Sequence, residues 1–399
     1  MTTYLGISAM GVISPVGKGK AQVADHLFRG TRDGMRLRAD LVPGRNVLVA
    51  EALGETPTLP AALAAWDCRN NRMLAAALDE IRPDIEGAIA RHGRDRIAVI
   101  LGTSTSGIAE GEAAYATRLA SGQWPAGFDY RQQEVGGLSA FAQAYLGLVG
   151  PAYTIATACS SSAKAFGVAR RLIRAGLVDA AIVGGVDSLC RMTPSGFQAL
   201  GAVSAHPANP FSRNRDGITV GEAAAVFLLE REESEVLFMG IGETSDAHHI
   251  SAPDPAGLGA EEAMREALRD AGCSASEVAY VNLHGTATPL NDAMESRAVH
   301  DVFGEQTPCS STKAMTGHTL GAAGACEAAF LWLTLARQHN PEHRLPPHLW
   351  DGAHDPSLAP LRLAEPGDRF TDRGRVAMLS NSFAFGGSNV ALVLGRAAP

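Results

Sequence analysis

A cysteine set among small polar residues is the first candidate for chemistry in this sequence. Cys159 lies in the run TACSSS at residues 157–162, after a β-branched stretch that predicts a strand and before an Ala/Arg-rich stretch that predicts a helix. This junction would place Cys159 at a helix N-terminus, where unpaired backbone N–H groups and the helix dipole lower the pKa of a thiol. The same N–H groups could stabilise the oxyanion that develops on a thioester carbonyl. We therefore predict that Cys159 is a nucleophile.

Two histidines and a lysine stand in comparable settings. His284 opens the run HGTATP after a predicted strand, and catalytic groups of α/β sheets collect at the carboxyl ends of strands. Lys313 and His318 belong to the run KAMTGH, directly before a Gly/Ala-rich segment that opens a predicted helix. Each of these side chains alone would be interpreted as a surface or structural residue. Together with a cysteine at an element end, they indicate nucleophilic thioester chemistry with oxyanion stabilisation.

The other five cysteines carry no comparable signal. They are far apart, form no CxxC pair, and are predicted to be small buried hydrophobic residues: Cys68, Cys190, Cys273, Cys309 and Cys326. The first residues resemble a strand that runs into a Gly/Pro turn, not an export signal, and no stretch approaches the roughly 20 apolar residues of a membrane span. We expect a cytoplasmic protein with reduced thiols and neither a metal site nor a membrane span.

Composition excludes several classes of partner. The chain has 399 residues, of which 46% are hydrophobic and 19% charged, enough for two domains or one large double domain. The net charge of -8 is spread along the chain without a Lys/Arg block, which argues against a nucleic acid partner. The Gly-rich segments 102–107 and 320–325 lack the phosphate-loop and dinucleotide spacings. Tight packing between helix and sheet explains these glycines better than a nucleotide site.

Two similar halves must position the candidate residues. Short β-branched runs alternate with longer helical stretches, the pattern of an α/β layered fold. In the first half we predict strands at residues 96–101, 153–158, 180–184 and 224–229 and a helix at 163–175. In the second half we predict strands at 236–243, 278–283, 376–380 and 390–394 and helices at 261–271 and 322–337. We place the halves at 1–233, with the nucleophile, and 234–399, with both histidines and the lysine; residues 340–360 are predicted to be an irregular surface segment.

At these residues the sequence resembles the β-ketoacyl synthase family of the thiolase superfamily, in its Cys-His-His branch. Six motifs match in order over nearly the whole chain: GVISPVG at 11–17, TACSSS at 157–162, PFSRNRDG at 210–217, HGTATP at 284–289, KAMTGHTLGAAGA at 313–325 and NSFAFGGSN at 381–389. Six motifs in order are a specific signal. The resemblance implies the thiolase-like five-layered αβαβα fold made of two related halves, which is usually a dimer.

The resemblance also implies a reaction. An acyl carrier protein would transfer an acyl chain to Cys159, after which a malonyl group on a carrier protein would lose CO2. His284 and His318 would donate hydrogen bonds to the thioester oxygen of the resulting enolate, whose carbon would attack the acyl group. Lys313 would supply positive potential and pair with Glu327. No metal or diffusible cofactor is implied, because decarboxylation generates the carbanion and the substrates are carried on the phosphopantetheine arm of the carrier protein.

Further residues take expected roles by the same resemblance. The backbone N–H groups of Cys159 and Phe385 would form the oxyanion hole, and the Phe385 side chain would act as a gate between the half-reactions. Thr286 and Thr288 would hydrogen-bond the phosphopantetheine arm, and Phe383 would contact the substrate. By alignment, Thr105 would face the acyl tail.

The chain departs from the family pattern at three places. The family's Gly-Asp after the HGT motif is Asn291-Asp292 here, its GDGAG-like turn is GEAA at residues 221–224, and the Asp common after PF is Ser212. None of these changes removes a proposed catalytic group, and Asp292 is expected to give structural support. The Asn291-Asp292 variant resembles that of bacterial synthases which build aryl polyenes.

Three alternatives compete with a condensing enzyme. A non-catalytic chain-length factor, which forms half of a heterodimeric synthase, would have no physical need for Cys159, His284, Lys313 and His318 together. A thiolase acting on coenzyme A thioesters would use a second cysteine as its base, which the glycine-rich context of His318 disfavours. An interaction module would use the polar turns only as helix caps. The expected partners are an acyl carrier protein and a second synthase-like subunit, either in a homodimer or in a heterodimer with a homologous synthase or chain-length factor.

Overall fold

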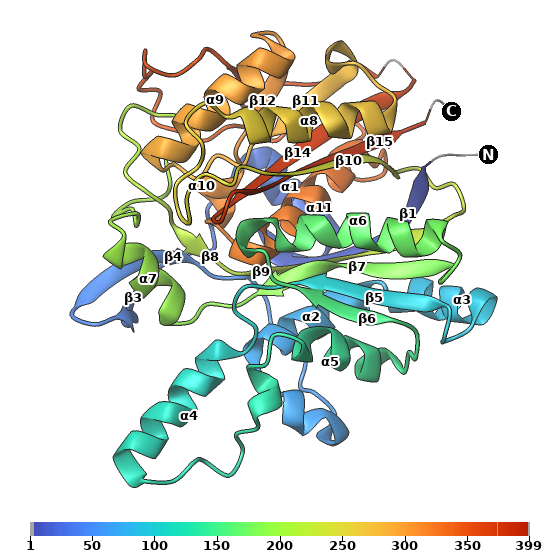
Figure 1. Cartoon of the computed structure of the whole chain (residues 1–399), viewed down its shortest axis with the longest axis vertical. Helices are drawn as coiled ribbons and strands as arrows, with labels where there is room; N and C mark the ends of the chain where they lie inside the picture. Colours follow the sequence, from blue (N-terminus) through green and yellow to red (C-terminus); the bar gives the residue numbers. More distant parts are fainter. Residues whose placement is uncertain (1–3, 373, 398–399) are drawn as a thin grey trace.

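Two halves with the same strand order build the protein, which is described by a computed structural model for residues 4–372 and 374–397 (Figure 1). The sheet of the first half has the order β6-β5-β7-β9-β1, and that of the second half has the order β12-β11-β14-β15-β10 with β13 at its edge. Numbered along the chain within each half, both orders are 3-2-4-5-1. The first-half strands are β1 (Leu5–Ser14), β5 (Ile97–Gly102), β6 (Ala152–Ile155), β7 (Ala180–Asp187) and β9 (Ala223–Glu230). The second-half strands are β10 (Leu237–Ser245), β11 (Val278–Asn282), β12 (Pro308–Ser310), β13 (Arg362–Leu363), β14 (Val376–Ala384) and β15 (Ser388–Arg396).

The same mixture of strand directions recurs in both halves. β5 runs parallel to β6 and β7, as β11 runs parallel to β12 and β14, while the remaining pairs of each order are antiparallel. The halves join where β1 and β10 pair at Leu5↔Phe238 and Gly6↔Leu237. The predicted fold of two related halves is therefore confirmed. The boundary predicted at residues 233 and 234 falls in the link between β9 and β10.

Helices form the other three layers (Figure 1). α6 (Ser161–Arg174) and α11 (Ala323–Leu335) lie between the two sheets and pack on each other. α2 (Arg69–Glu80) and α5 (Gly137–Leu146) cover the outer face of the first sheet, and α8 (Leu258–Ala271) and α9 (Pro289–Phe303) cover the outer face of the second. Every residue of α11 except Trp332 is buried, as expected for a helix that is apolar on all sides and enclosed by two sheets.

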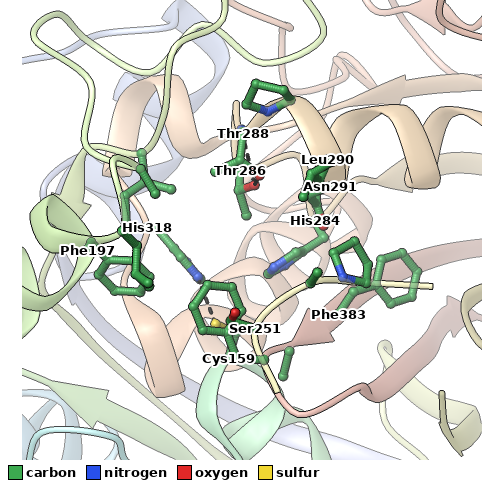
Figure 2. A pocket seen from close by; sticks show the side chains of 18 of the residues that line it. Cys159, Phe197, Ser251, His284, Thr286, Thr288, Leu290, Asn291, His318 and Phe383 are labelled. Carbon is green, nitrogen blue, oxygen red and sulfur yellow. Dashed lines mark hydrogen bonds between the residues drawn. The ribbon is translucent and has the colours of Figure 1, made fainter. Parts of the chain in front are cut away.

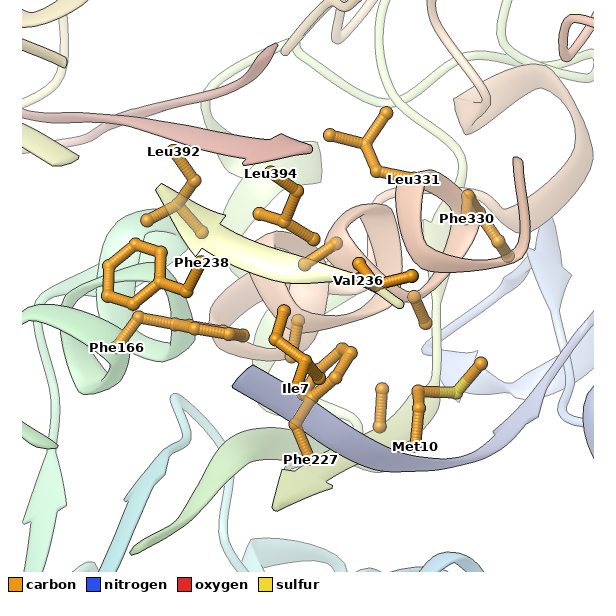
Figure 3. Packing of buried hydrophobic residues seen from close by; sticks show 14 of the residues in the cluster. Ile7, Met10, Phe166, Phe227, Val236, Phe238, Phe330, Leu331, Leu392 and Leu394 are labelled. Carbon is orange, nitrogen blue, oxygen red and sulfur yellow. The ribbon is translucent and has the colours of Figure 1, made fainter. Parts of the chain in front are cut away.

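The core between the sheets is dominated by aromatic and branched side chains (Figure 3). Phe166 of α6 packs against Phe227 of β9 and Phe238 of β10, with ring centroids 5.1 Å and 5.5 Å apart. Such tilted aromatic pairs contribute about 0.5–1.5 kcal/mol each beyond their buried area. Because every residue of β7 and β9 is buried, these central strands of the first sheet are enclosed on both faces.

Two sequence-based predictions of local structure need correction. The strand predicted over residues 153–158 ends at Ile155, because Ala158 takes a left-handed backbone (φ 51°) and begins the short 3-10 turn η3 (Ala158–Ser160). Residues 340–360 are irregular as predicted, but residues 345–348 are buried and do not lie on the surface. His348 anchors this segment, since its Nδ1 accepts from the Ser311 N–H at 3.1 Å and its Nε2 lies 3.0 Å from the Pro210 carbonyl oxygen.

The remaining elements lie around this core. They are β2 (Gly17–Lys18), α1 (Lys20–Arg29), β3 (Met35–Val42), β4 (Arg45–Ala50), α3 (Arg82–His92), α4 (Ile108–Ser121), α7 (Met192–Ala199), β8 (Val220–Gly221) and α10 (Lys313–Thr316), with short 3-10 turns at Ala61–Trp66, Tyr130–Gln132, Ala275–Glu277 and Leu320–Ala322. α4 projects from the first half beyond the helices that cover its sheet (Figure 1). Within residues 4–372 and 374–397, none of the helices has the length and apolar character that crossing a membrane requires.

Candidate active site

A cavity of about 290 Å³ contains the predicted nucleophile and both predicted histidines (Figure 2). Cys159 lies in η3, where the chain turns from β6 into α6, and its side chain is buried at the floor of this cavity. His284 follows β11 and His318 follows α10, so the second half contributes both rings to a nucleophile of the first half. The site therefore exists only where the two halves meet.

The three side chains lie close together. Nε2 of His318 is 2.9 Å from Sγ of Cys159, within hydrogen-bonding distance. The His284 ring stands edge-on to the His318 ring, with centroids 5.2 Å apart and an angle of 84° between the planes. Both rings point toward the same open space above the sulfur (Figure 2). One oxygen atom of a bound thioester could therefore receive hydrogen bonds from both imidazoles.

A buried ion pair lies behind the histidines. Nζ of Lys313 pairs with Oε1 of Glu327 on α11, and both side chains are almost completely enclosed. The positive charge of Lys313 lowers the pKa values of His284 and His318 and acts in the same direction on the pKa of Cys159. Burial raises the pKa of Glu327 to about 7, although its partner opposes this. The ion pair expected from the resemblance is present, and it puts positive potential beside the cavity.

Burial determines the protonation states at the site. Burial and the charge of Lys313 hold the pKa values of His284 and His318 well below 6.5, so both rings are neutral at physiological pH. Burial also raises the pKa of the Cys159 thiol to about 12, and the opposing charge of Lys313 and the backbone N–H of Phe385 do not offset it. The lowered thiol pKa that the helix N-terminus predicted is therefore wrong for the free enzyme. At rest the pair is a neutral thiol facing a neutral imidazole.

Phe385 approaches the sulfur through its backbone. It lies in the tight turn between β14 and β15, where Gly386 and Gly387 take positive φ values of 83° and 75° that favour glycine. Its backbone N–H acts on the Cys159 thiol and lowers the pKa of that thiol, although burial outweighs this effect. Its ring is 41% exposed and packs on the Phe197 ring at a centroid distance of 5.7 Å. The backbone of Phe385 thus lies where an oxyanion-hole donor is needed, and its ring covers the cavity.

Comparison with known proteins assigns this geometry to a family. Family models described as the N-terminal and C-terminal domains of β-ketoacyl synthase match residues 71–235 and 236–344. A 3-oxoacyl-[acyl-carrier-protein] synthase 2 from Staphylococcus aureus is 30% identical over 409 aligned positions, covering 97% of this chain and 99% of the relative. The chain belongs to the β-ketoacyl synthase family. It is accordingly an enzyme of the acyltransferase type.

Solved structures agree with the family assignment. The ketosynthase ApeO in complex with its chain length factor ApeC, from Xenorhabdus doucetiae, matches with a TM-score of 0.92 and 46% identity over 99% of this chain and 98% of that one. The ishigamide ketosynthase/chain length factor matches with a TM-score of 0.83 and 27% identity over 98% and 99% of the two chains. Both comparisons confirm the thiolase-like fold class that the sequence predicts.

The outer part of the ketosynthase cavity carries the two predicted threonines. Thr286 and Thr288 both line it, and their hydroxyl oxygens are 2.9 Å apart (Figure 2). Phe383 lines the cavity deeper inside and stands edge-on to the His284 ring, with centroids 6.1 Å apart. These positions suit the roles expected from the resemblance, which stay predictions.

Thr105 is not among the residues that line the cavity. Its side chain is buried, and its hydroxyl donates to Oδ1 of Asp187 at 2.9 Å, while its backbone N–H donates to the same oxygen at 2.8 Å. A side chain held by a buried carboxylate is not free to face this cavity. The predicted contact of Thr105 with an acyl tail is therefore not supported by the cavity of a single chain.

Two buried acids of the ketosynthase were missed by sequence reasoning. Asp187, at the end of β7, accepts hydrogen bonds from the loop after β5 and from the Ala322 N–H in the second half. Glu295, on α9, accepts from the N–H of His284 at 2.7 Å and from that of Gly285 at 2.6 Å. The predicted support residue Asp292 accepts from the Ala287 N–H at 3.2 Å. Buried carboxylates therefore hold the loop after β5, the turn before α11 and the loop that carries His284.

A metal ion fits this site poorly. Ligand atoms of Cys159, His284 and His318 do lie within 4.8 Å of one another, a spacing that a zinc ion could use. However, the contact between the Cys159 sulfur and His318 engages two of these atoms, and the positive charge of Lys313 acts on all three residues. Such a potential repels a cation and favours an anionic intermediate.

Proposed function

We propose that the chain catalyses the decarboxylative Claisen condensation of an acyl group on Cys159 with a malonyl thioester, both delivered by an acyl carrier protein. The observation that carries the proposal is the cavity geometry: the Cys159 thiol lies 2.9 Å from the neutral ring of His318, and the neutral ring of His284 faces the same space. Two histidine donors suit an enolate oxygen, because a thioester enolate develops charge on that atom.

In the first half-reaction, the Cys159 sulfur attacks the carbonyl carbon of the acyl thioester while its proton passes to Nε2 of His318. The carbonyl oxygen becomes an oxyanion that accepts hydrogen bonds from the backbone N–H groups of Cys159 and Phe385. Collapse of this intermediate breaks the carbon–sulfur bond to the carrier. The carrier sulfur leaves as a thiol with the proton that His318 held, and the acyl group stays on Cys159.

In the second half-reaction, the malonyl thioester loses CO2, and the electron pair of the broken carbon–carbon bond forms an enolate. Acylated Cys159 no longer donates to Nε2 of His318. This neutral ring can then change tautomer, with Nδ1 releasing its proton to water and Nε2 taking one up. Its Nε2–H can then donate to the enolate oxygen alongside a ring N–H of His284. The enolate carbon attacks the acyl carbonyl carbon, a new carbon–carbon bond forms, and the Cys159 thiolate leaves and takes a proton from water. The scheme needs no metal or diffusible cofactor, because decarboxylation supplies the electron pair.

The partner that delivers the substrates must reach a buried nucleophile. Cys159 lies at the floor of a narrow cavity, which suits a substrate on a long flexible arm such as phosphopantetheine. Two exposed apolar side chains line the cavity, Leu200 directly after α7 and Leu290 at the start of α9. The exposed Ile250 directly precedes the lining residue Ser251, and its carbonyl accepts from the Gly386 N–H at 2.8 Å. Such a rim suits the apolar face of a small carrier domain.

A second synthase-like subunit completes the proposed assembly. The ApeO structure and the ishigamide structure are both described as a ketosynthase with a chain length factor. In this chain, β6 ends the first sheet and its Tyr153 side chain is 51% exposed, and α4, which projects from the same half, exposes Tyr115 and Leu119. An open strand edge with exposed aromatic residues suits pairing with a related subunit. Since this chain has the complete Cys-His-His-Lys set, we assign it the catalytic place in such a pair, in preference to the non-catalytic one.

The pathway and compartment are finer proposals. The Asn291-Asp292 variant resembles that of aryl polyene synthases, and the 46% identity with the ApeO complex is much higher than the 27–28% found for the ishigamide enzyme and a β-ketoacyl synthase of Burkholderia phymatum. We therefore place the chain in the aryl-polyene-type branch. We also propose a cytoplasmic location, which suits six cysteines that are all free.

The test is a product assay with matched primers. The purified chain, alone and with candidate partner subunits, is incubated with malonyl-carrier protein and with either saturated, unsaturated or aryl acyl-carrier proteins. We expect a β-ketoacyl product two carbons longer than the primer, with conjugated or aryl primers preferred. Efficient extension of long saturated primers and none of the unsaturated or aryl primers would contradict the branch assignment, and no extension of any primer would contradict the proposed reaction.

A further inference from the structure

Asn291 forms a bridge between two buried carboxylates beside the catalytic loop. It lies in the first turn of α9, lines the cavity, and is largely buried. Its Nδ2 is 3.2 Å from Oδ1 of Asp292 and 3.3 Å from Oε2 of Glu295. The amide has two N–H hydrogens, so it can donate one to each carboxylate at the same time.

The two acids hold the loop that carries His284. Glu295 accepts the N–H groups of His284 and Gly285, which are the first two residues of the loop. Asp292 accepts the N–H groups of Ala287 at 3.2 Å and of Phe211 at 2.8 Å. Together the carboxylates hold the backbone from His284 to Ala287 and the neighbouring backbone at Phe211.

This loop needs such support because its backbone is strained. Ala287 in this loop and Phe211 in a separate segment both donate their N–H groups to Asp292, and they have positive φ values of 65° and 60° without being glycine. A left-handed backbone at a residue with a side chain costs of order 1–3 kcal/mol and persists only where its surroundings enforce it. The ionised carboxylate accepts both N–H groups and so enforces the conformation.

Two adjacent buried acids repel each other. Burial raises the pKa of Asp292 to about 6 and that of Glu295 to about 7, and the charge of Asp292 adds to the rise at Glu295. The cations that act on them are Arg215 on Asp292 and Lys313 on Glu295.

Both cations form their ion pairs with other acids. Arg215 pairs with Asp355, and Lys313 pairs with Glu327. Burial and the charge of Glu295 both raise the pKa of the Cys309 thiol, so this group is a neutral neighbour of Glu295. The neutral amide of Asn381 donates to Oε1 of Glu295 at 3.3 Å. Asn291 is thus the donor that the two acids share.

We propose that Asn291 is a positioning residue that holds the Asp292 and Glu295 carboxylates in their loop-binding arrangement and thereby sets the position of His284. The position that matches Asn291 is glycine in the family pattern. The bridge between the two carboxylates therefore distinguishes this chain from relatives that have glycine there. The activity part of the inference rests on the proposed condensation, whereas the structural part does not.

The first test is the pH dependence of condensation in Asn291→Leu, which keeps a similar volume and removes both donors. The donated hydrogen bond lowers the pKa of Asp292, so its loss raises that pKa further. The loop needs the ionised acid, and activity is lost as pH falls through its pKa. We therefore expect the acidic limb of the kcat profile to move upward by about one pH unit, since a hydrogen bond to a charged group corresponds to roughly that shift. An unchanged acidic limb would overturn the proposal.

The second test needs no activity. The Tm of Asn291→Leu is compared with that of the unaltered chain at pH 5 and pH 8. Because the bridge is strongest when both acids are ionised, we expect a loss of roughly 2–4 °C at pH 8 and less than half of that at pH 5. Equal losses at the two pH values would show a packing role only and would refute the bridge.

A matched control makes the same chemical change elsewhere. Asn46 is exposed on β4, away from the cavity, so Asn46→Leu should give the same Tm difference at both pH values and leave the kcat profile unchanged. If the unaltered chain proves inactive, the proposed condensation fails, while the Tm comparison still decides whether Asn291 bridges the two acids.

Discussion

Replacement of Lys313 by methionine separates the structural and catalytic contributions of the buried ion pair. The Lys313→Met change keeps most of the side-chain volume but leaves Glu327 without its partner in an almost fully enclosed position. Removing one member of a buried pair costs about 3–5 kcal/mol, because the remaining charge is desolvated and uncompensated. For a chain of 399 residues this corresponds to a loss in Tm of about 4–6 °C.

The loss should depend on pH in a defined direction. Burial raises the pKa of Glu327 to about 7, and loss of the Lys313 charge raises it further. The variant can then avoid the buried charge by binding a proton, so its deficit relative to the unaltered chain shrinks as pH falls from 8 to 6. Thermal unfolding followed by circular dichroism at several pH values measures this deficit.

A double variant gives the decisive comparison. Lys313→Met with Glu327→Gln removes both charges, so most of the lost stability should return, whereas activity should not, because the positive potential beside Cys159 and the histidines is still missing. A double variant that is less stable than Lys313→Met, or a single variant that loses less than about 1 kcal/mol, would refute the description of this pair.

Three further predictions follow from individual contacts. In Gly321→Ala, the new Cβ would lie 2.7 Å from Oγ of Ser104 and 2.8 Å from its backbone nitrogen, so we expect a stability loss of about 1–3 kcal/mol by denaturant unfolding, and no measurable loss would contradict the packing. Alkylation of Cys159 by iodoacetamide should be slow at pH 7 and rise continuously up to pH 10, because burial raises the thiol pKa to about 12; a plateau below pH 8 would show a thiolate at rest. Asp187→Asn places an amide donor against N–H groups, including that of Ala322, and should destabilise the chain by about 1–3 kcal/mol in thermal unfolding, whereas a stability equal to that of the unaltered chain would contradict a carboxylate anchor.

The sequence predicts the reactive groups well because they are marked by local signals. Cys159 stands between a strand pattern and a helix pattern, and His284 and His318 stand in polar runs at element ends, so their positions follow from periodicity and from the matched motifs. The structure brings all three to one cavity. Lys313 and Glu327 were paired by resemblance alone, and they are indeed in contact.

The supporting acids could not be predicted from local sequence. Nothing in the sequence around Asp187 and Glu295 distinguishes them from acidic residues on a protein surface. Their burial is explained only by hydrogen bonds to residues distant in the sequence. The hydroxyl of Thr105 donates to Asp187, which lies 82 positions further along the chain. Alignment does not show this contact, and it therefore predicted that Thr105 faces an acyl tail. One signal was available for Glu295, because it follows Asp292 by three positions and shares its helix face.

The prediction of a lowered pKa for the Cys159 thiol was wrong for a similar reason. A helix N-terminus is visible in the sequence, but the depth at which it is buried is not. At Cys159 the desolvation of the thiolate outweighs the donors that surround it, so the structure reverses the expected direction. Local chemistry thus identified the residue, while tertiary burial set its protonation state.

The central claim is that Cys159 carries the acyl group in a site made by both halves. It is tested most directly by intact-protein mass spectrometry after incubation with an acyl-carrier protein, with Cys159→Ser as the control. We predict a mass gain equal to one acyl group that maps to Cys159, that is absent as a thioester in the serine variant, and that disappears when malonyl-carrier protein is added. A folded chain that is never acylated with any carrier-bound primer, even with a partner subunit present, would contradict the account.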